Sequence, residues 1–160
     1  MGYMLGRCYL RFRTLFVPVI VIAAFATSCQ AQPPVDAAAR ERSAMAQAFS
    51  QERLSVWKKR LKLEDWTITV QMARTTELKA RTLGNIHWDS DTKTAAIRVL
   101  DPADYTLPED AMLKDMEFTV VHELIHLKLS PLLSTVPRSE ASRRDEEHTV
   151  NNIADALLGR

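Results

Sequence analysis

Two histidines and a glutamate lie close together in the C-terminal third of the chain, in the order His122-Glu123-Leu124-Ile125-His126. Residues four apart on an α-helix share a face, so both imidazoles can reach one metal ion while Glu123 lies beside them. Paired imidazoles suit zinc, although other divalent ions tolerate the same donors, and a neighbouring carboxylate can act as a general base. We therefore predict a site for one Zn²⁺ per chain with Glu123 as the base.

The residues around this motif are strongly apolar, which indicates a buried helix. They are Phe118, Val120, Val121, Leu124, Ile125, Leu127 and Leu129. A glutamate in such surroundings is costly unless a metal ion or a hydrogen-bond donor compensates its charge. The simpler alternative is an exposed polar stripe on a core helix that binds no metal.

A catalytic zinc needs a third protein ligand and one open position for water. The candidates downstream are Glu146, Glu147 and His148. The helix predicted here has an apolar stripe made of Val150, Ile153, Ala154 and Leu157. Glu146 and Glu147 flank that stripe on opposite sides, with a slight preference for Glu146. The helical pattern leaves both glutamates open, together with the possibility of a solvated acidic patch near the helix start.

The order of these residues resembles that of the gluzincin metallopeptidases, the clan that includes thermolysin. In those enzymes a glutamate ligand on a second helix follows the two-histidine motif, and the spacing from His126 to Glu147 is close to theirs. The resemblance implies a zinc-dependent peptidase that acts on peptides or proteins. It also implies that His122, His126 and Glu147 are the three ligands.

The second helix further resembles the Glu-x-x-Ala-Asn-x-Phe-Ala helix of ImmA/IrrE-type peptidases. From Glu147 onward, Asn151 and Ala154 match this pattern, whereas Val150 and Ile153 depart from it. In both groups a polar residue four positions after the ligand orients a zinc-bound histidine. The resemblance therefore implies that Asn151 has this supporting role.

In such minimal zincins a sheet precedes the active-site helix, and the strand nearest the cleft binds the substrate backbone by strand addition. We expect residues 94–100 to be that strand. Thermolysin-like enzymes also have His or Tyr residues beyond the glutamate helix that stabilise the tetrahedral intermediate. With Arg160 as the last residue, Tyr105, His87 or His148 are the candidates for this role, and each also fits an ordinary surface or packing position.

Hydrophobic periodicity predicts one α+β domain over residues 37–160. Its elements would be an N-terminal helix, a small antiparallel or mixed sheet of about three strands, the active-site helix and the glutamate helix. The predicted bounds are a helix at 37–63, strands at 66–72, 83–88 and 94–100, and helices at 115–129 and 142–158. The last two strands should form an antiparallel hairpin, and Ser142 with Asp145 resembles a capping box.

Residues 1–28 are predicted to be a signal peptide. Arg7, Arg11 and Arg13 precede an apolar run at 15–26, which is too short to span a membrane comfortably. The protein should therefore be exported.

Residues 26–29, Ala-Thr-Ser-Cys, resemble a bacterial lipobox. This implies that Cys29 is acylated, that 29–36 is a tether, and that a lipid anchor holds the protein in the bacterial cell envelope facing the periplasm. Cleavage after Ala31, which would release a soluble exported protein, and an uncleaved anchor are the alternatives. Cys8 is the one other cysteine, so no disulfide is expected in the mature domain.

The overall composition fits a globular domain, since 46% of the 160 residues are hydrophobic and 26% are charged. Three of the 21 basic residues precede residue 29, which leaves 18 against 20 acidic residues afterwards. This balance gives no indication of a nucleic-acid partner.

Two other classes of function remain open from the sequence. The first is a zinc-binding structural or regulatory protein without hydrolytic activity. The second is an interaction protein that acts through the helix at 37–63, which could also cover the cleft.

Overall fold

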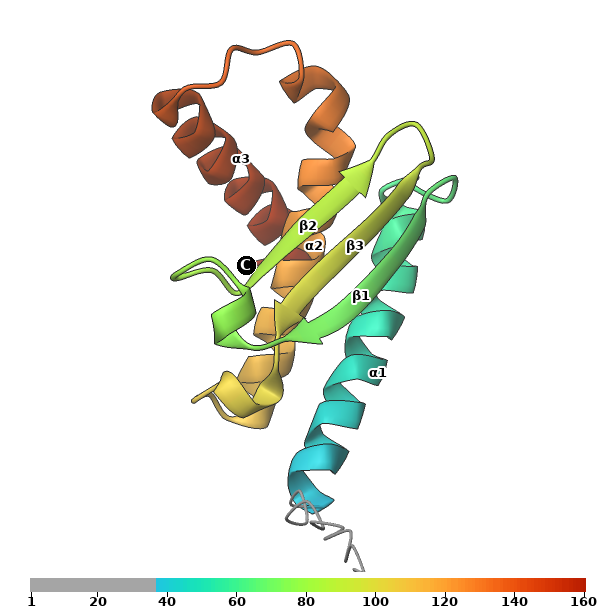
Figure 1. The fold of residues 1–160 in the computed structure, drawn as a ribbon, viewed down its shortest axis with the longest axis vertical. Helices are drawn as coiled ribbons and strands as arrows, with labels where there is room; N and C mark the ends of the chain where they lie inside the picture. Colours follow the sequence, from blue (N-terminus) through green and yellow to red (C-terminus); the bar gives the residue numbers. More distant parts are fainter. Residues whose placement is uncertain (1–36) are drawn as a thin grey trace, which may run out of the picture. The chain divides into compact units, whose positions relative to one another are not determined.

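The computed structural model describes residues 37–160, so the predicted signal peptide, Cys29 and the tether at 29–36 lie outside the described residues. The described chain is α+β, as predicted (Figure 1). Its elements are α1 (Ala37–Arg60), β1 (Thr67–Ala73), η1 (Thr75–Glu77), β2 (Gly84–Asp89), β3 (Thr94–Leu100), η2 (Pro102–Asp104), α2 (Glu109–Leu133) and α3 (Glu140–Leu158). None of the helices in this part of the chain is long and apolar enough to cross a membrane.

The three strands form one mixed sheet in the order β1-β3-β2. β3 runs parallel to β1 and antiparallel to β2, which confirms the predicted hairpin. Both edges of β3 are therefore hydrogen-bonded to neighbours. The prediction that residues 94–100 bind substrate by strand addition is wrong, because a central strand has no free backbone edge to offer.

One face of the sheet packs against the helices. Side chains alternate between the two faces of a strand, and Ile68 and Val70 of β1 are buried together with Ile97 and Val99 of β3. Figure 1 shows α1 and α2 on the same side of the sheet. This face carries the apolar core of the domain.

Helix α1 is part of that core. Leu54 and Trp57 are buried in the main apolar cluster, and the indole Nε1 of Trp57 donates a hydrogen bond of 2.8 Å to Oε1 of Glu117 on α2. The helix ends at Arg60, three residues earlier than predicted. Lys62 has a φ of 54° in the left-handed region, a conformation that commonly follows a helix end.

Helix α2 is longer than predicted at both ends. It begins at Glu109 instead of 115, directly after Pro108, and its first turn contains Glu109 and Asp110. Acidic side chains there interact favourably with the helix dipole. The helix continues to Leu133, and its buried residues include Met112 and Val120 on the side that faces the core.

Helix α3 begins at Glu140, and its N-cap is Ser139, three residues before the predicted cap. The Ser139 hydroxyl accepts a hydrogen bond from the Ser142 backbone N–H at 3.0 Å, and the Ser142 hydroxyl accepts one from the Ser139 N–H at 2.9 Å. Ser142 is thus the second member of a capping box and not its first, and the predicted pairing with Asp145 is wrong. The helix ends before Gly159, whose φ is 70°.

Candidate metal centre

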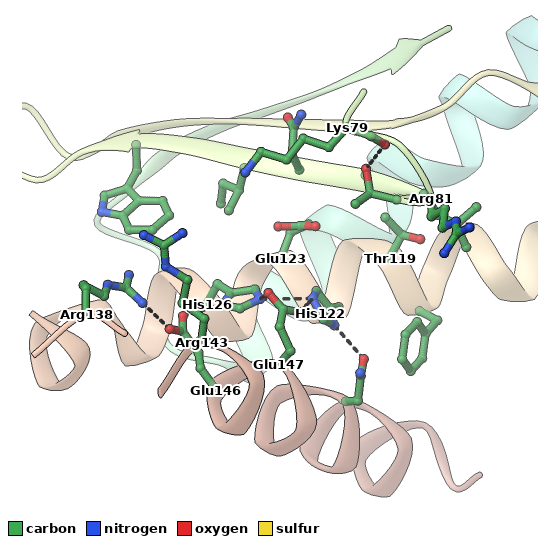
Figure 2. Close-up of a pocket in the computed structure, with 18 residues that line it drawn as sticks. Lys79, Arg81, Thr119, His122, Glu123, His126, Arg138, Arg143, Glu146 and Glu147 are labelled. Carbon is green, nitrogen blue, oxygen red and sulfur yellow. Dashed lines mark hydrogen bonds and ion pairs between the residues drawn. The ribbon is translucent and has the colours of Figure 1, made fainter. Parts of the chain in front are cut away.

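His122 and His126 lie one turn apart on α2 and face α3. Their Nε2 atoms are 3.0 Å apart. His126 is buried, with 9% of its surface exposed. Figure 2 shows both rings directed at the same point, which Glu147 approaches from α3.

The Glu147 carboxylate completes a group of three donors, the donor triangle, whose ligand atoms all lie within 4.8 Å of one another. Its Oε2 lies 3.3 Å from Nε2 of His122, and its Oε1 lies 3.5 Å from Nε2 of His126. A tetrahedral zinc ion with bonds of about 2.0–2.1 Å separates its donors by about 3.4 Å. Each of the three separations, two of them to different oxygens of Glu147, is therefore close to the separation of two ligands in a tetrahedral zinc site.

The second nitrogen of each imidazole has a hydrogen-bond acceptor behind it. Nδ1 of His122 lies 3.0 Å from Oδ1 of Asn151, and Nδ1 of His126 lies 3.0 Å from Oε1 of Glu146. An ionised carboxylate can only accept a hydrogen bond, so Nδ1 of His126 donates the proton, and Asn151 Oδ1 has the same role toward His122. The neutral imidazoles then carry lone pairs on both Nε2 atoms.

With both imidazoles neutral and protonated at Nδ1, two Nε2 lone pairs and a carboxylate would face one another, an arrangement that a cation stabilises. Burial, followed by the charge of His126, lowers the pKa of His122, which favours the neutral form that binds metals. Two imidazoles, one carboxylate and an acceptor behind each imidazole are the donors that zinc prefers. The residues present therefore fit a zinc ion.

The two adjacent glutamates occupy different places. Glu146 lies behind His126 and also pairs with Arg138, whereas Glu147 faces the two Nε2 atoms. The slight preference of the helical pattern for Glu146 does not match this arrangement. That Glu147 binds the ion stays a prediction, as does the supporting role of Asn151.

Glu123 lies beside the histidines with only 7% of its surface exposed. Its carboxylate enters the cleft from α2 (Figure 2), and no residue within 37–160 is hydrogen-bonded to it. Burial, followed by the charge of Glu147, raises the pKa of Glu123 to about 8 in the metal-free protein. A bound cation would oppose this rise and favour the carboxylate, which is the form a general base requires.

The donor triangle opens into a cleft of about 690 Å³ between β2, α2 and α3. Gly84 begins β2 where the strand crosses α2, and a Cβ atom at this position would lie 2.4 Å from Cγ2 of Thr119. Glycine therefore allows β2 to approach the helix one turn before Glu123. Within the described residues the outer edge of β2 pairs with no other strand.

The sequence analysis did not predict that β2 approaches α2 closely at Gly84 and borders the cleft. The signal was present, because an isolated glycine inside a strand indicates a close backbone approach. It also missed the contact between Glu146 and His126 and the basic side chains at the cleft, namely Lys79, Arg81, Arg138 and Arg143.

The three candidates for stabilising the tetrahedral intermediate are not among the residues that line the cleft. The Tyr105 hydroxyl instead donates a hydrogen bond of 2.9 Å to Oδ2 of Asp115. His148 is exposed near Asn152, and His87 is exposed on β2. The structure therefore does not bring these residues to the donor triangle.

Comparison with models of protein families, with curated proteins and with solved structures gives no match. The function of this site therefore has to be inferred from its own geometry.

Proposed function

We propose that the protein is a zinc metallopeptidase that hydrolyses peptide bonds. One observation carries this proposal. The Nε2 atoms of His122 and His126 lie 3.0 Å apart, and the two oxygens of the Glu147 carboxylate lie 3.3 and 3.5 Å from them, which brings three donors together at separations close to those between zinc ligands. The acceptors behind both imidazoles leave these nitrogens free for a metal ion.

His122, His126 and Glu147 would hold the ion. Zinc in such a site supplies a Lewis acid and lowers the pKa of a water molecule at its open position. Glu123 accepts the proton of the attacking water on its carboxylate and transfers it to the nitrogen of the departing amine. Its burial keeps bulk water from competing for that proton.

The substrate would lie along β2. The free edge of this strand presents backbone N–H and C=O groups to the cleft, and an extended peptide can pair with them as an added strand. In this proposal β2, and not the strand at residues 94–100 as predicted from the sequence, binds the substrate backbone by strand addition. A peptide bound in this way passes between the strand and the donor triangle.

We also propose that the protein is exported and held in the bacterial cell envelope by a lipid on Cys29. The basis is the sequence of residues 1–29 alone. Metabolic labelling with a fatty acid tests it, because a Cys29→Ser variant should lose the label and the membrane association. Equal labelling of both proteins would contradict the lipid anchor.

A zinc-binding protein without hydrolytic activity is the second candidate. It is favoured by the position of Tyr105, His87 and His148, none of which lines the cleft. The interaction hypothesis for α1 has less support. The buried side of this helix packs on the rest of the domain, so its removal would expose the core.

Elemental analysis and a peptidase assay separate these possibilities. The purified full-length protein should contain one zinc per chain, and His126→Ala should lose it. Wild type should hydrolyse a denatured protein substrate, and a chelator or Glu123→Gln should abolish this activity, the latter with zinc still bound. Bound zinc without hydrolysis would favour the second candidate. A wild-type protein that takes up no zinc after reconstitution would exclude both.

A further inference from the structure

The cleft contains more positive than negative side chains. Its basic residues are Lys79, Arg81, Arg138 and Arg143, and its acidic residues are Glu123, Glu146 and Glu147. With all seven of these groups ionised, a divalent ion in the donor triangle would raise the excess from one positive charge to three. The whole chain, by contrast, has a net charge of only +1. Positive charge is therefore concentrated where a substrate would bind.

Two arginines near the donor triangle differ in how their charge is used. Arg138 pairs with Glu146, which in turn accepts the hydrogen bond from His126. Arg143 forms no ion pair with any carboxylate in residues 37–160. Its charge is therefore available to a ligand.

The position of Arg143 on α3 directs it to the cleft. It lies four residues before Glu147, so both side chains share one face of the helix, and both line the cleft. Figure 2 shows Arg143 rising from α3 past His126 toward the strand. Trp88 of β2, which is 38% exposed, lines the same cleft.

Arg143 is in the first turn of α3, next to the positive end of the helix dipole, where a basic side chain is unfavourable by about 0.3–1 kcal/mol. A carboxylate bound to Arg143 would remove this penalty. The planar guanidinium also binds carboxylates through two parallel hydrogen bonds.

We propose, on the basis of the proposed peptidase function, that Arg143 binds a carboxylate of the substrate close to the cleaved bond. The carboxylate belongs either to an acidic side chain or to the free C-terminus of the peptide. Arg143 is thus a specificity-determining residue, and the protein selects peptides that carry a carboxylate at this position.

Binding measurements test this without relying on turnover. Three decapeptides with a neutral coumarin label share one sequence and differ only in charge. The first has two internal Glu and an amidated C-terminus, the second has Gln in their place and the same amide, and the third has Gln and a free C-terminal carboxylate. Fluorescence anisotropy gives the affinity of each for the Glu123→Gln protein, with zinc and without it.

One of the two carboxylate peptides should bind about twofold to fivefold more tightly than the neutral peptide, and the preferred one identifies the source of the carboxylate. Arg143→Ala, added to the Glu123→Gln protein, should abolish this difference. Arg144→Ala is the matched control, since it removes the neighbouring charge from the same helix turn but does not line the cleft. It should leave the difference intact.

The proposal is overturned if the neutral peptide binds as well as the others, if none of the three binds, or if Arg143→Ala keeps the preference. The proposed function is tested separately. Selective binding without hydrolysis would exclude the peptidase and retain the carboxylate site. Hydrolysis without a preference for either carboxylate peptide would support the peptidase and exclude the carboxylate site.

Discussion

The two edges of the small sheet differ in what lies beside them, because a helix covers one edge and an open cleft borders the other. At the β1 edge, Gln47 of α1 donates a hydrogen bond of 2.9 Å to the Val70 carbonyl, and α1 packs alongside with Leu54 and Trp57 buried. At the other edge, β2 borders an open cleft that leads to the donor triangle. A sheet edge that is left uncovered can pair with another chain.

This difference separates the part of the domain that stabilises the fold, at the β1 edge, from the part that we propose binds the metal ion, at the β2 edge. The covered side consists mainly of apolar contacts, whose removal should affect folding. The open side consists of paired polar groups around His122 and His126, whose removal should affect metal binding. The predictions below change one side at a time and measure both properties.

The largest effect is expected on the open side, from Glu147→Gln. The substitution keeps the shape of the side chain and removes the charge that faces the two Nε2 atoms. Zinc binding contributes about 10–16 kcal/mol shared among few ligands, so affinity should fall on the order of a thousandfold. Competition with a chromogenic chelator measures it.

Glu140→Gln is the matched control, because Glu140 lies at the exposed start of the same helix. Its zinc affinity should equal that of wild type. Unchanged affinity in Glu147→Gln would exclude this glutamate as a ligand.

The donor triangle also shows why sequence could identify the metal motif but not the choice between two glutamates. The pair His122 and His126 is defined by local spacing. The choice between Glu146 and Glu147 depends on the rotation of α3 about its axis. Val150 and Ala154 are fully buried, whereas Ile153, Leu157 and Leu158 are only partly buried, which turns the Glu147 side toward α2. Only the packing of the two helices reveals this.

The sheet was predicted in part for a similar reason. Period-two alternation gave the bounds of β3 without error and those of β1 and β2 to within one residue. Strand order is set by pairing between distant segments, and no local pattern reports that β3 lies between the other two. The surface arginines Arg138 and Arg143 were missed because a lone charge in a sequence gives no indication of what it faces.

On the covered side, Leu54→Ala should destabilise the protein by about 2–5 kcal/mol, because it leaves a cavity in the core next to α2. Chemical denaturation measures the free energy of unfolding. Zinc content per folded molecule should not change. Val56→Ala on the exposed side of α1 is the control and should stay within about 0.5 kcal/mol of wild type. Loss of zinc from folded Leu54→Ala would show that the two sides are coupled.

At the contact between β2 and α2, Gly84→Ala should lower both the stability of the fold and the rate of peptide hydrolysis. The new Cβ would meet Thr119 Cγ2 at 2.4 Å and the Arg98 carbonyl oxygen at 2.6 Å, so the strand must move, at about 1–3 kcal/mol. Peptide hydrolysis should fall while zinc remains bound. Adding Thr119→Ser removes one clash and should restore part of the stability. Unchanged hydrolysis in Gly84→Ala would argue against substrate binding along β2.

The smallest effect is expected from Glu146→Gln, the same change as in Glu147→Gln but one residue earlier. The amide oxygen can still accept the hydrogen bond from Nδ1 of His126, so the imidazole keeps its orientation and loses only the nearby negative charge. Loss of a supporting contact typically weakens metal binding about 10–100-fold, and the retained hydrogen bond places this variant near tenfold. If Glu146→Gln instead loses zinc as completely as Glu147→Gln, then Glu146 would itself be a ligand, and its contact with His126 would not be a supporting one.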